Sequence, residues 1–442
     1  MSLIPFGFWA ASGSEAVTYW LATLGGASTD IAQGAAIDRD NNVYSFGKTS
    51  SSGAGGNDFL LSKFDAFGSI QWQRTLGGAS LEDGFSVATD SGKNAYAFGY
   101  TTSTGAGGND MLLAKYNSAG TIQWQRVLGG SDDDKGFAVA IDSADNIYIA
   151  GHTFSDATNN DFLLAKYNSS GTIQWQRTLG GEPSDFGRSV TIDSSDNVYI
   201  FGYTLSAGAG SDDFLLAKYN SSGTIQWQRV LGSASSQRGF SAATDSSNNI
   251  YLVGQAEGVG VWDIQLAKYD SAGSLVWQRV LSGLGSEDLG KSVAVDSSDN
   301  VYIFGNTNSI GAGSADFIMA KYNSSGTLQW QRVLGGTGAE AGYSIAIGSQ
   351  DAIVVCGFTT TTGEGSTDFL IAKLPSDGSL TGTYVLDGVD IVYAAATLTA
   401  ETSTLTAATS TLTAATSTLT ASTSSLTGAT STLTEHFVEI TA

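Results

Sequence analysis

The chain has 442 residues, with 42 acidic and 20 basic side chains, one cysteine and two histidines. The single cysteine excludes a disulfide scaffold and a cysteine-based zinc site, and two histidines exclude a histidine-rich metal centre. The net charge of −22 argues against nucleic acid and anionic membranes as partners, because both require a basic surface. We therefore expect no metal, no cofactor, no nucleic-acid partner and no membrane partner.

Residues 1–16 begin with an apolar, aromatic stretch, Met1-Ser-Leu-Ile-Pro-Phe-Gly-Phe-Trp-Ala-Ala11. No segment of the chain reaches the ~20 apolar residues that a membrane helix needs. A secretory signal is disfavoured too, because a positively charged region is missing and Pro5 and Gly7 interrupt the apolar run. We predict that residues 1–16 form an anchor peptide that inserts into a partner protein.

An internal repeat follows, marked by seven tryptophans that are 50–53 residues apart. They are Trp20, Trp72, Trp124, Trp175, Trp227, Trp277 and Trp330. Each unit contains four β-like runs separated by short turns. In the third unit these runs are 136–142, 146–153, 161–167 and 172–179, here named strands a, b, c and d. Four antiparallel strands repeated seven times predict a β-propeller, whose blades bury both faces against their neighbours.

The order of the units distinguishes a closed ring from an open solenoid. The first tryptophan strand, Val17–Leu24, precedes any strand a, whereas the seventh unit stops after strand c near Lys373. Val17–Leu24 can therefore supply the missing strand d of the seventh blade. We predict an all-β fold over residues 17–380, a seven-bladed propeller of four-stranded antiparallel blades closed by an N-terminal strand.

The repeated words of the sequence resemble those of the seven-bladed β-propeller repeat (SBBP) proteins. The resemblance rests on Asp-Asn-x-Tyr-x-x-Gly at 145–151, Asp-Phe-Leu-Leu-Ala-Lys-Tyr at 161–167 and Trp-Gln-Arg-x-Leu-Gly-Gly at 175–181. It covers about residues 17–380. It implies the propeller fold but no activity, because the family consists mostly of uncharacterised surface and secreted proteins.

Thirteen of the 20 bases occupy repeated positions, seven lysines in strand c and six arginines in strand d. A residue that every blade needs identically usually holds the blade together, so we interpret these bases as scaffold rather than as a ligand ring. The tryptophans are expected to pack between blades. The aspartates of the a–b turns, such as Asp142, lack the alternating oxygen donors of a calcium loop, so we expect Asx turns there.

No catalytic residues are predicted, and we expect a non-enzymatic protein. Only Arg39, Arg188 and Arg238 lie outside the repeated arginine positions, and they are scattered over three blades. They do not form the arginine triad with which sialidase propellers hold a carboxylate. Cys356 lies in an apolar run, where a buried, inert thiol is expected. Acidic pairs are abundant, so a polysaccharide-degrading propeller is kept as a third hypothesis.

Function is expected where the blades differ, on the face that carries the d–a and b–c loops. Seven equivalent positions at the end of strand b vary between blades, and Trp262 belongs to the unusual b–c loop of the fifth unit. The seven, here called the strand-b ring, are Lys48, Tyr100, His152, Tyr203, Gln255, Asn306 and Phe358. Aromatic, amide and hydroxyl groups suit sugar or peptide recognition. Drift at tolerant exposed positions is the alternative interpretation.

Acidic residues in six of the seven d–a loops predict a collar at the mouth of the channel. Such a collar suits a cation or a basic partner, and solubility explains it equally well.

Residues 381–442 change to a linker and then to a repeat of Thr, Ser, Ala and Leu. Its leucines are seven residues apart, at Leu398, Leu405, Leu412, Leu419, Leu426 and Leu433. This period predicts a stalk with an apolar helical seam that assembles a homo-oligomer, with a trimer favoured. Because Thr and Ser are mediocre helix formers, a flexible or glycosylated stalk and an extended intertwined fibre are alternatives.

The first thirteen residues resemble the beginnings of structural proteins of marine tailed phages. Together with the propeller and the predicted stalk, this resemblance leads to the hypothesis of a virion structural protein. Such a fibre, spike or surface decoration displays its propeller to a glycan or protein of the host surface. It contacts other virion proteins through its N-terminal peptide. The alternative is a secreted or cell-surface bacterial adhesion module.

Overall fold

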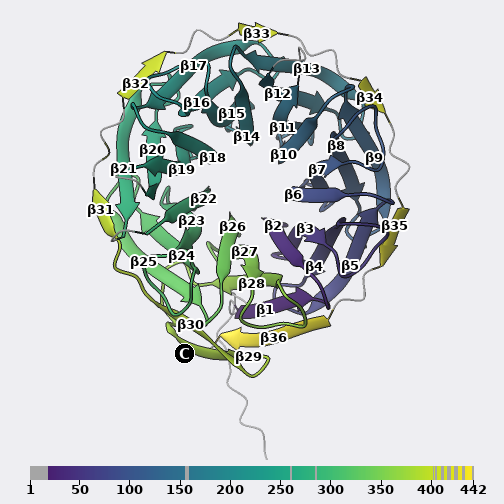
Figure 1. Ribbon diagram of the computed structural model, residues 1–442, viewed down its shortest axis with the longest axis vertical. Coiled ribbons are helices and arrows are strands. Elements are labelled where there is room, and N and C mark those ends of the chain that lie inside the picture. Colours follow the sequence, from purple (N-terminus) through teal and green to yellow (C-terminus); the bar gives the residue numbers. More distant parts are fainter. Residues whose placement is uncertain are drawn as a thin grey trace, which may run out of the picture.

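The described strands of the computed structural model form seven sheets around a central axis (Figure 1). The structure describes residues 18–154, 159–258, 261–283, 286–401, 403, 406–409, 413–415, 420–422, 427–430 and 434–440. The predicted all-β, seven-bladed propeller is confirmed. The predicted anchor peptide, residues 1–16, lies outside the described residues.

Six blades consist of four consecutive strands, ordered a to d from the channel outwards (Figure 1). Blade 1 comprises β2 (Asp30–Ile37), β3 (Val43–Thr49), β4 (Asp58–Phe64) and β5 (Ile70–Gly77). Blade 2 comprises β6 (Glu82–Thr89), β7 (Ala95–Thr101), β8 (Asp110–Tyr116) and β9 (Ile122–Gly129). Blade 3 comprises β10 (Asp134–Ile141), β11 (Ile147–Phe154), β12 (Asn160–Tyr167) and β13 (Ile173–Gly180).

The remaining blades repeat this plan. Blade 4 comprises β14 (Asp185–Ile192), β15 (Val198–Thr204), β16 (Asp213–Tyr219) and β17 (Ile225–Gly232). Blade 5 comprises β18 (Gln237–Thr244), β19 (Ile250–Glu257), β20 (Trp262–Tyr269) and β21 (Leu275–Ser282). Blade 6 comprises β22 (Asp288–Val295), β23 (Val301–Thr307), β24 (Asp316–Tyr322) and β25 (Leu328–Gly335). Blade 7 comprises β26 (Glu340–Ile347), β27 (Ile353–Thr359), β28 (Asp368–Leu374) and β1 (Tyr19–Gly25).

Strand β1 closes the ring, as predicted. It pairs antiparallel with β28, with Trp20 opposite Lys373 and Leu24 opposite Phe369. The predicted strand began at Val17, whereas β1 begins at Tyr19. Trp20 is fully buried, so the first strand of the chain is locked into the last blade by both hydrogen bonding and core packing.

The tight turns of each unit are held by their own polar side chains. In blade 3, Asp142 Oδ1 accepts the backbone N–H of Ala144 at 3.0 Å and of Asn146 at 2.8 Å. Asn168 Oδ1 likewise accepts the N–H of Thr172 at 2.9 Å, and Gly171 provides the positive φ of 76° that the turn requires. The Asx-turn interpretation of the turn aspartates is confirmed.

The repeated lysine, tryptophan and arginine join each blade to the next. In blade 3, Lys166 Nζ and Trp175 Nε1 both donate to the carbonyl of Ser221 in blade 4, each at 3.3 Å. Arg177 Nε donates to the carbonyl of Gly223 in the same turn at 2.8 Å. These contacts confirm the scaffold interpretation of the repeated residues, because they cross the interface between blades instead of facing a ligand.

The C-terminal tail covers the outer edge of every blade. A hairpin of β29 and β30, turning at Asp387 and Gly388 with positive φ, begins this belt on blade 6. The belt strands are β29 (Gly382–Leu386), β30 (Val389–Ala395), β31 (Thr399–Glu401), β32 (Thr406–Thr409), β33 (Thr413–Ala415), β34 (Thr420–Ser422), β35 (Thr427–Thr430) and β36 (Thr434–Ile440). From β30 to β36 they pair in turn with blades 6, 5, 4, 3, 2, 1 and 7.

The belt advances by seven residues per blade. Positions 393, 400, 407, 414, 421, 428 and 435 face Leu334, Leu281, Leu231, Leu179, Leu128, Leu76 and Leu24, which are equivalent leucines of the strands d. Seven residues of extended chain span ~23 Å at ~3.3 Å per residue. The period of the tail therefore matches the step from one blade to the next.

The helical interpretation of the tail is thus wrong for the described segments, which are short strands along the propeller rim and not a projecting stalk. The outermost strand of each blade offers unpaired backbone groups, and β-branched Thr favours a strand over a helix. Among the described tail residues there is no helical seam of the kind on which the predicted trimer depended. Any oligomeric assembly stays a prediction.

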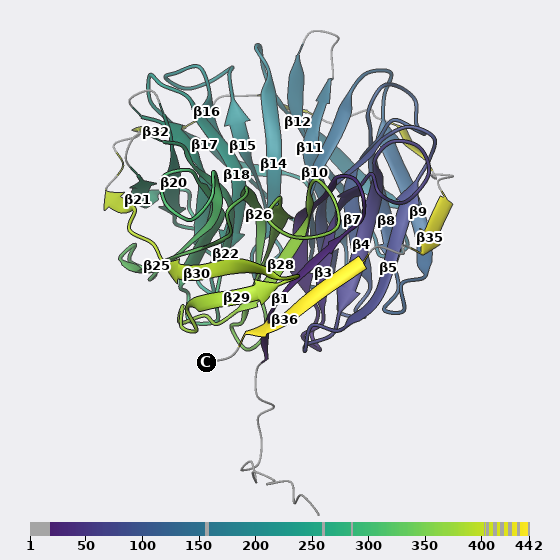
Figure 2. The ribbon, with the colours of Figure 1, turned by 60° about the horizontal axis from the view of Figure 1, so that its bottom comes forward.

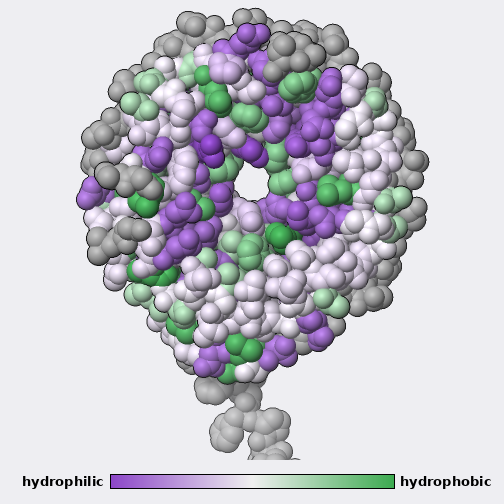
Figure 3. Space-filling model, in the orientation of Figure 1, coloured by the Kyte–Doolittle hydropathy of each residue, from purple (hydrophilic) through white to green (hydrophobic). Residues whose placement is uncertain are grey.

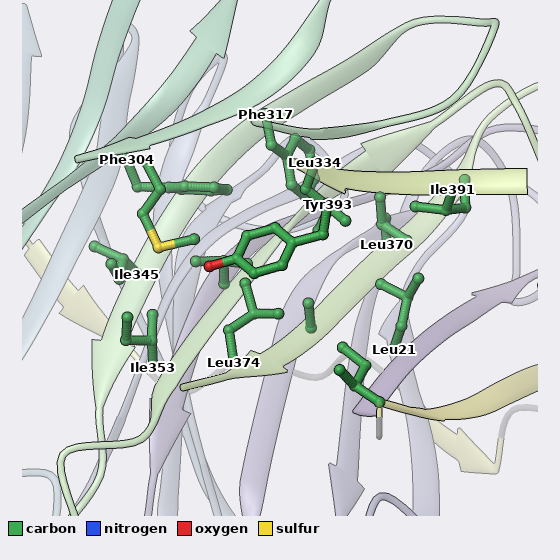
Figure 4. Packing of buried hydrophobic residues seen from close by; sticks show 14 of the residues in the cluster. Leu21, Phe304, Phe317, Leu334, Ile345, Ile353, Leu370, Leu374, Ile391 and Tyr393 are labelled. Atoms are coloured by element: carbon green, nitrogen blue, oxygen red, sulfur yellow. The ribbon is translucent and has the colours of Figure 1, made fainter. Parts of the chain in front are cut away.

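Both ends of the belt meet beside the closing strand. Figure 2 shows β36 lying along the outside of β1, next to β29. Leu386 and Ile391 from the start of the belt belong to the same buried cluster as Ile440 from its end and Leu21 of β1. Several members of this cluster are drawn in Figure 4. The belt is therefore a complete circuit, and blade 7 holds segments from both ends of the chain.

One side chain shows how the belt is fastened. Gln331 of β25 is buried, and its amide donates to the carbonyl of Leu398 at 2.7 Å and accepts the N–H of Leu398 at 3.0 Å. The side-chain amide thereby makes the two hydrogen bonds that a neighbouring strand would make, at the position where the belt leaves blade 6.

We expect Gln331→Ala to lower the free energy of unfolding by about 1–3 kcal/mol, because both backbone groups of Leu398 lose their partner in a buried place. Gln329→Ala is the matched control. Gln329 is exposed and bonds only to the carbonyl of Thr327, so its loss is expected to change stability by less than about 0.5 kcal/mol. Denaturant unfolding of both variants measures the difference, and equal effects would contradict the fastening role.

Candidate functional site at the central channel

A β-bulge in the innermost strand of every blade turns one side chain towards the channel. In blade 3 the register of β10 and β11 shifts between Gly136 and Ala138, which leaves Phe137 as the extra residue. Bulges commonly re-aim a side chain in this way. The seven bulged residues, here called the channel ring, are Gln33, Phe85, Phe137, Arg188, Phe240, Lys291 and Tyr343.

In six blades a glycine precedes the bulge and lets neighbouring blades approach closely, whereas blade 1 has Ala32 at this place. A Cβ atom on Gly136 would lie 2.3 Å from the ring of Phe98 and 2.6 Å from the carbonyl oxygen of Gly99, both in the preceding blade. No side chain fits there without moving the backbone. The bulge recurs at the same place in every blade, including blade 1 with its Ala32, while the bulged residue itself varies.

The channel ring surrounds a cavity of about 190 Å³. All seven of its residues line this cavity, and Figure 3 shows the channel open at one face of the propeller. The lining is unequal around the ring, because four of its side chains are aromatic, two are cations and one is an amide. Such a mixture of apolar walls and a few polar groups is typical of small-ligand sites.

The two cations of the ring lie over aromatic faces. Arg188 Cζ is 4.2 Å from the ring centroid of Phe137, and Lys291 Nζ is 4.0 Å from that of Phe240. Among the described residues neither cation has a carboxylate within ion-pair distance. Burial lowers the pKa of Lys291 to about 8, helped by the nearby charge of Arg188. Lys291 is therefore largely charged at pH 7 and loses its charge just above pH 8.

The strand-b ring lies immediately outside the channel ring. Each member pairs with the residue of strand a that is two positions before the channel-ring residue, as His152 does with Lys135 and Tyr203 with Phe186. Its members are not the exposed groups that were expected. His152, Tyr203, Gln255 and Asn306 are buried, and Lys48, Tyr100 and Phe358 are half-buried.

The two rings share a continuous aromatic cluster in blades 2, 3 and 4. Successive contacts join Tyr100, Phe85, Phe137, His152, Phe186 and Tyr203, with ring centroids 4.8–5.5 Å apart. Arg238 extends the cluster into blade 5, because its guanidinium is 5.8 Å from the ring of Tyr203 and 5.2 Å from that of Trp262. The structure thus brings together Tyr100, His152, Tyr203 and Trp262.

The other predicted site residues are placed differently. Lys48 pairs with Asp83 at 2.9 Å, and the same carboxylate accepts the hydroxyl of Tyr100 at 2.7 Å. The ring centroid of Phe358 lies 6.2 Å from that of Tyr343 of the channel ring. Gln255 on β19 pairs with Arg238 at the end of the aromatic cluster, whereas Asn306 on β23 pairs with Leu289 of blade 6. The expected ring is therefore a supporting layer with one aromatic side, and its ligand-binding role stays a prediction.

Several buried polar atoms near the channel have no hydrogen-bond partner among the described residues. They are His152 Nδ1, Arg188 Nε and Gln255 Oε1. Burial and the charge of Arg188 lower the pKa of His152 to about 3, so this imidazole is neutral at physiological pH. Orphaned polar atoms beside a cavity indicate a place that water or a ligand occupies.

The remaining sequence candidates for chemistry are Cys356 and the three arginines outside the repeated positions. Cys356 is buried, as expected, and burial raises the pKa of its thiol far above the usual range. Three or more metal-ligating side chains do not meet anywhere in the described part of the chain. Arg188 and Arg238 both approach Tyr203, whereas Arg39 lies exposed in an a–b turn.

Most of the predicted acidic collar is buried and structural. The acid that begins strand a accepts the N–H of the preceding d–a loop, as Asp30 does from Gly26 at 2.9 Å and Glu82 from Gly78 at 2.8 Å. These acids do not face the channel mouth. The exposed acids of the d–a loops are Asp132, Asp133, Glu182 and Glu287.

The channel ring was missed by the sequence interpretation, although a signal was present. Strand a reads Asp-Phe-Gly-Arg-Ser-Val in blade 4 and Asp-Leu-Gly-Lys-Ser-Val in blade 6. The residue after the glycine varies inside an otherwise repeated word. This variable position within a strand that is otherwise repeated was the signal in the sequence that indicated the channel ring.

Two family profiles match parts of the chain. The profile described as "Beta-propeller repeat" (SBBP) matches residues 123–156, 174–208 and 276–311. These three stretches are therefore similar to SBBP repeats. A profile described as a β-propeller domain of unknown function (DUF5122) matches residues 144–173. Both descriptions agree with the fold, and neither names an activity.

Two curated relatives match the propeller over part of its length. An uncharacterized WD repeat-containing protein of Acanthamoeba polyphaga mimivirus is 22% identical over 246 residues, which are 40% of this chain and 18% of that protein. The regulatory protein FlaEY of Caulobacter vibrioides is 25% identical over 170 residues, which are 34% and 17%. The matched part is less than a fifth of the length of either relative.

Solved structures with a similar fold include functionally unrelated proteins. Polysaccharide lyase Uly1 is 9% identical with a TM-score of 0.49, covering 80% of this chain and 90% of that one. Sqt1 of Chaetomium thermophilum is 11% identical with a TM-score of 0.45, covering 82% of this chain and 98% of that one.

In the described part of this chain, no helix is long and apolar enough to span a membrane.

The propeller is expected to become more stable when the pH falls from 8 to 5. Burial, and second the carboxylate of Glu82, raises the pKa of Asp58 to about 7. Burial also raises the pKa values of Asp263, Asp316 and Asp368 to about 6. A carboxyl whose folded pKa exceeds its unfolded value contributes stability below the unfolded pKa and loses it as the pH rises through the folded one. Thermal melting at pH 5, 6, 7 and 8 measures the trend.

Asp58→Asn tests the origin of this trend, because Asn imitates the protonated acid. We expect this variant to be more stable than the wild type at pH 8 and to show a flatter pH profile. The control, Asp132→Asn, changes an exposed acid and should keep the wild-type profile. A falling stability from pH 8 to 5 would contradict the assignment.

Proposed function

We propose that this SBBP propeller is a non-enzymatic attachment module that binds a glycan of a host surface at the channel mouth. The observation that supports it most strongly is the channel ring, an open cavity with aromatic walls and two cations that have no acidic partner among the described residues. Stacking faces and a few hydrogen-bonding groups suit a sugar. The neutral His152 and the buried Cys356 offer no group poised for catalysis at neutral pH.

We further propose that the attachment module belongs to a virion. The support is the resemblance of the first thirteen residues to structural proteins of marine tailed phages. The belt supports an exposed setting too, because it leaves only short edge strands at the rim, such as the three-residue β31 and β33, and short edges resist pairing with other chains. A secreted or cell-surface adhesion module is the alternative.

Binding of the fluorescently labelled full chain to an array of bacterial and marine polysaccharides tests the attachment function. We expect Phe137→Ala to reduce binding at least fivefold, because Phe137 forms part of the channel wall and supports Arg188. Phe67→Ala is the matched control, since Phe67 is 53% exposed in a c–d turn on the other face. Melting temperatures show whether both variants are folded. Equal binding by the wild type and Phe137→Ala, or release of reducing sugars, would contradict the proposal.

Mass spectrometry of gradient-purified particles, cell envelopes and culture supernatant tests the location. We expect peptides of this chain to be enriched in the particles. Enrichment in the envelope or supernatant instead would favour the cell-surface or secreted alternative.

A further inference from the structure

We propose that the channel ring holds the terminal acidic sugar of a glycan, with the sugar carboxylate between Arg188 and Lys291. This proposal deepens the attachment function and rests on it for its biological setting. The site itself rests on the bulged side chains, the cavity that they enclose and the unpaired cations within it.

The distribution of basic residues singles out these two side chains. Seven bases lie outside the repeated positions. Four of them, Lys48, Lys93, Lys135 and Arg238, form ion pairs with acids. Arg39 is exposed in a turn, and the remaining two line one cavity. In a chain of net charge −22, two cations that line one cavity with no carboxylate within ion-pair distance among the described residues are unfavourable unless an anion joins them.

The cations are held ready for an anion. The positions of Arg188 over Phe137 and of Lys291 over Phe240 keep both side chains against the channel wall. Arg188 has one weak hydrogen bond, to the hydroxyl of Tyr203 at 3.5 Å, and its Nε has none among the described residues. A carboxylate would satisfy these donors with charge-assisted hydrogen bonds.

The rest of the cavity selects a sugar over a bare anion. Phe85 and Tyr343 line the same cavity and provide apolar area for the C–H face of a pyranose ring. The amide of Gln33 and the hydroxyl of Tyr343 can bond sugar hydroxyls. Because seven blades close the wall, a ligand enters by its end, so a terminal unit fits better than the middle of a chain.

The surroundings disfavour a polyanion. Asp132, Asp133, Glu182 and Glu287 are exposed in the d–a loops on the same side as the strand-b ring. A strand of nucleic acid or a highly sulfated polymer would bring many negative charges past these carboxylates. One carboxylate on a terminal sugar reaches Arg188 and Lys291 with the least repulsion.

Isothermal titration calorimetry of the full chain with D-glucuronate at pH 7 tests the proposal. We expect Arg188→Gln and Lys291→Gln each to weaken binding at least tenfold, because each removes a charged partner of the carboxylate. Arg39→Gln removes the same charge outside the channel and should bind like the wild type. D-Glucose, acetate and inorganic phosphate serve as ligand controls, and each should bind at least tenfold more weakly than glucuronate.

A pH series separates a direct contact from a structural effect. The groups that act on Lys291 are Arg188, Glu287 and Arg238. As Lys291 loses its proton above pH 8, glucuronate binding should weaken between pH 7 and 9.5. Lys291→Arg stays charged and should keep its affinity over this range. A merely structural lysine would give the same pH profile in both proteins.

The possible outcomes distinguish this proposal from the attachment function. Absence of glucuronate binding, or equal binding of acetate or phosphate, would overturn the acidic-sugar site. If the array shows attachment that glucuronate and both channel variants leave unchanged, the site proposal fails and the attachment function stands. If glucuronate binds as expected but the array shows no attachment, the site proposal stands and the attachment function fails.

Discussion

The unpaired backbone groups of open strand edges are the constraint on which this structure depends. A blade of four strands leaves an outer edge, and the seventh blade is also one strand short in the order of the chain. Strand β1 fills the missing place beside β28, and the belt covers the outer strand of all seven blades. The belt strands protect the long outer strands of the blades, and the edges that remain at the rim are short, such as the three-residue β31, β33 and β34.

The sequence repeat made the propeller predictable. The repeat of the tail led to a wrong prediction, a helical seam. In blade 3 the predicted strands agree with β10 to β13 within about two residues at each end. The leucine period of the tail was attributed to the geometry of one helix. The seven-residue period matches the distance from one blade to the next instead. Ala407 pairs with Leu231 of blade 4, and Ala414, seven residues later, pairs with Leu179 of blade 3. Sequence periodicity alone does not reveal whether a repeat matches the turns of its own helix or the spacing of other parts of the fold.

The candidate site was only partly predictable, since it depends on backbone detail. Tyr100, His152 and Tyr203 were recognised because they vary at the end of a strand, but pairing alone could not show that Phe85 and Phe137 lie between them and the channel. The bulge adds one residue to strand a and turns it inwards. Simple alternation of strand residues does not foresee such a change. The seven blades place one bulged residue each at equivalent positions. The differences between these seven residues make the candidate site asymmetrical.

The placement of β1 between β28 and β36 has a consequence for biosynthesis. Its residues leave the ribosome before any other strand of the propeller, yet both of its partners are translated more than 340 residues later. Nascent blades can therefore stack one after another in an unfinished ring, while the first strand has blade 1 to pack against but no strand to pair with. The ring and its belt are completed only after β28 and β36 have been translated, so a ribosome that stops before β28 releases a chain with every outer edge still open.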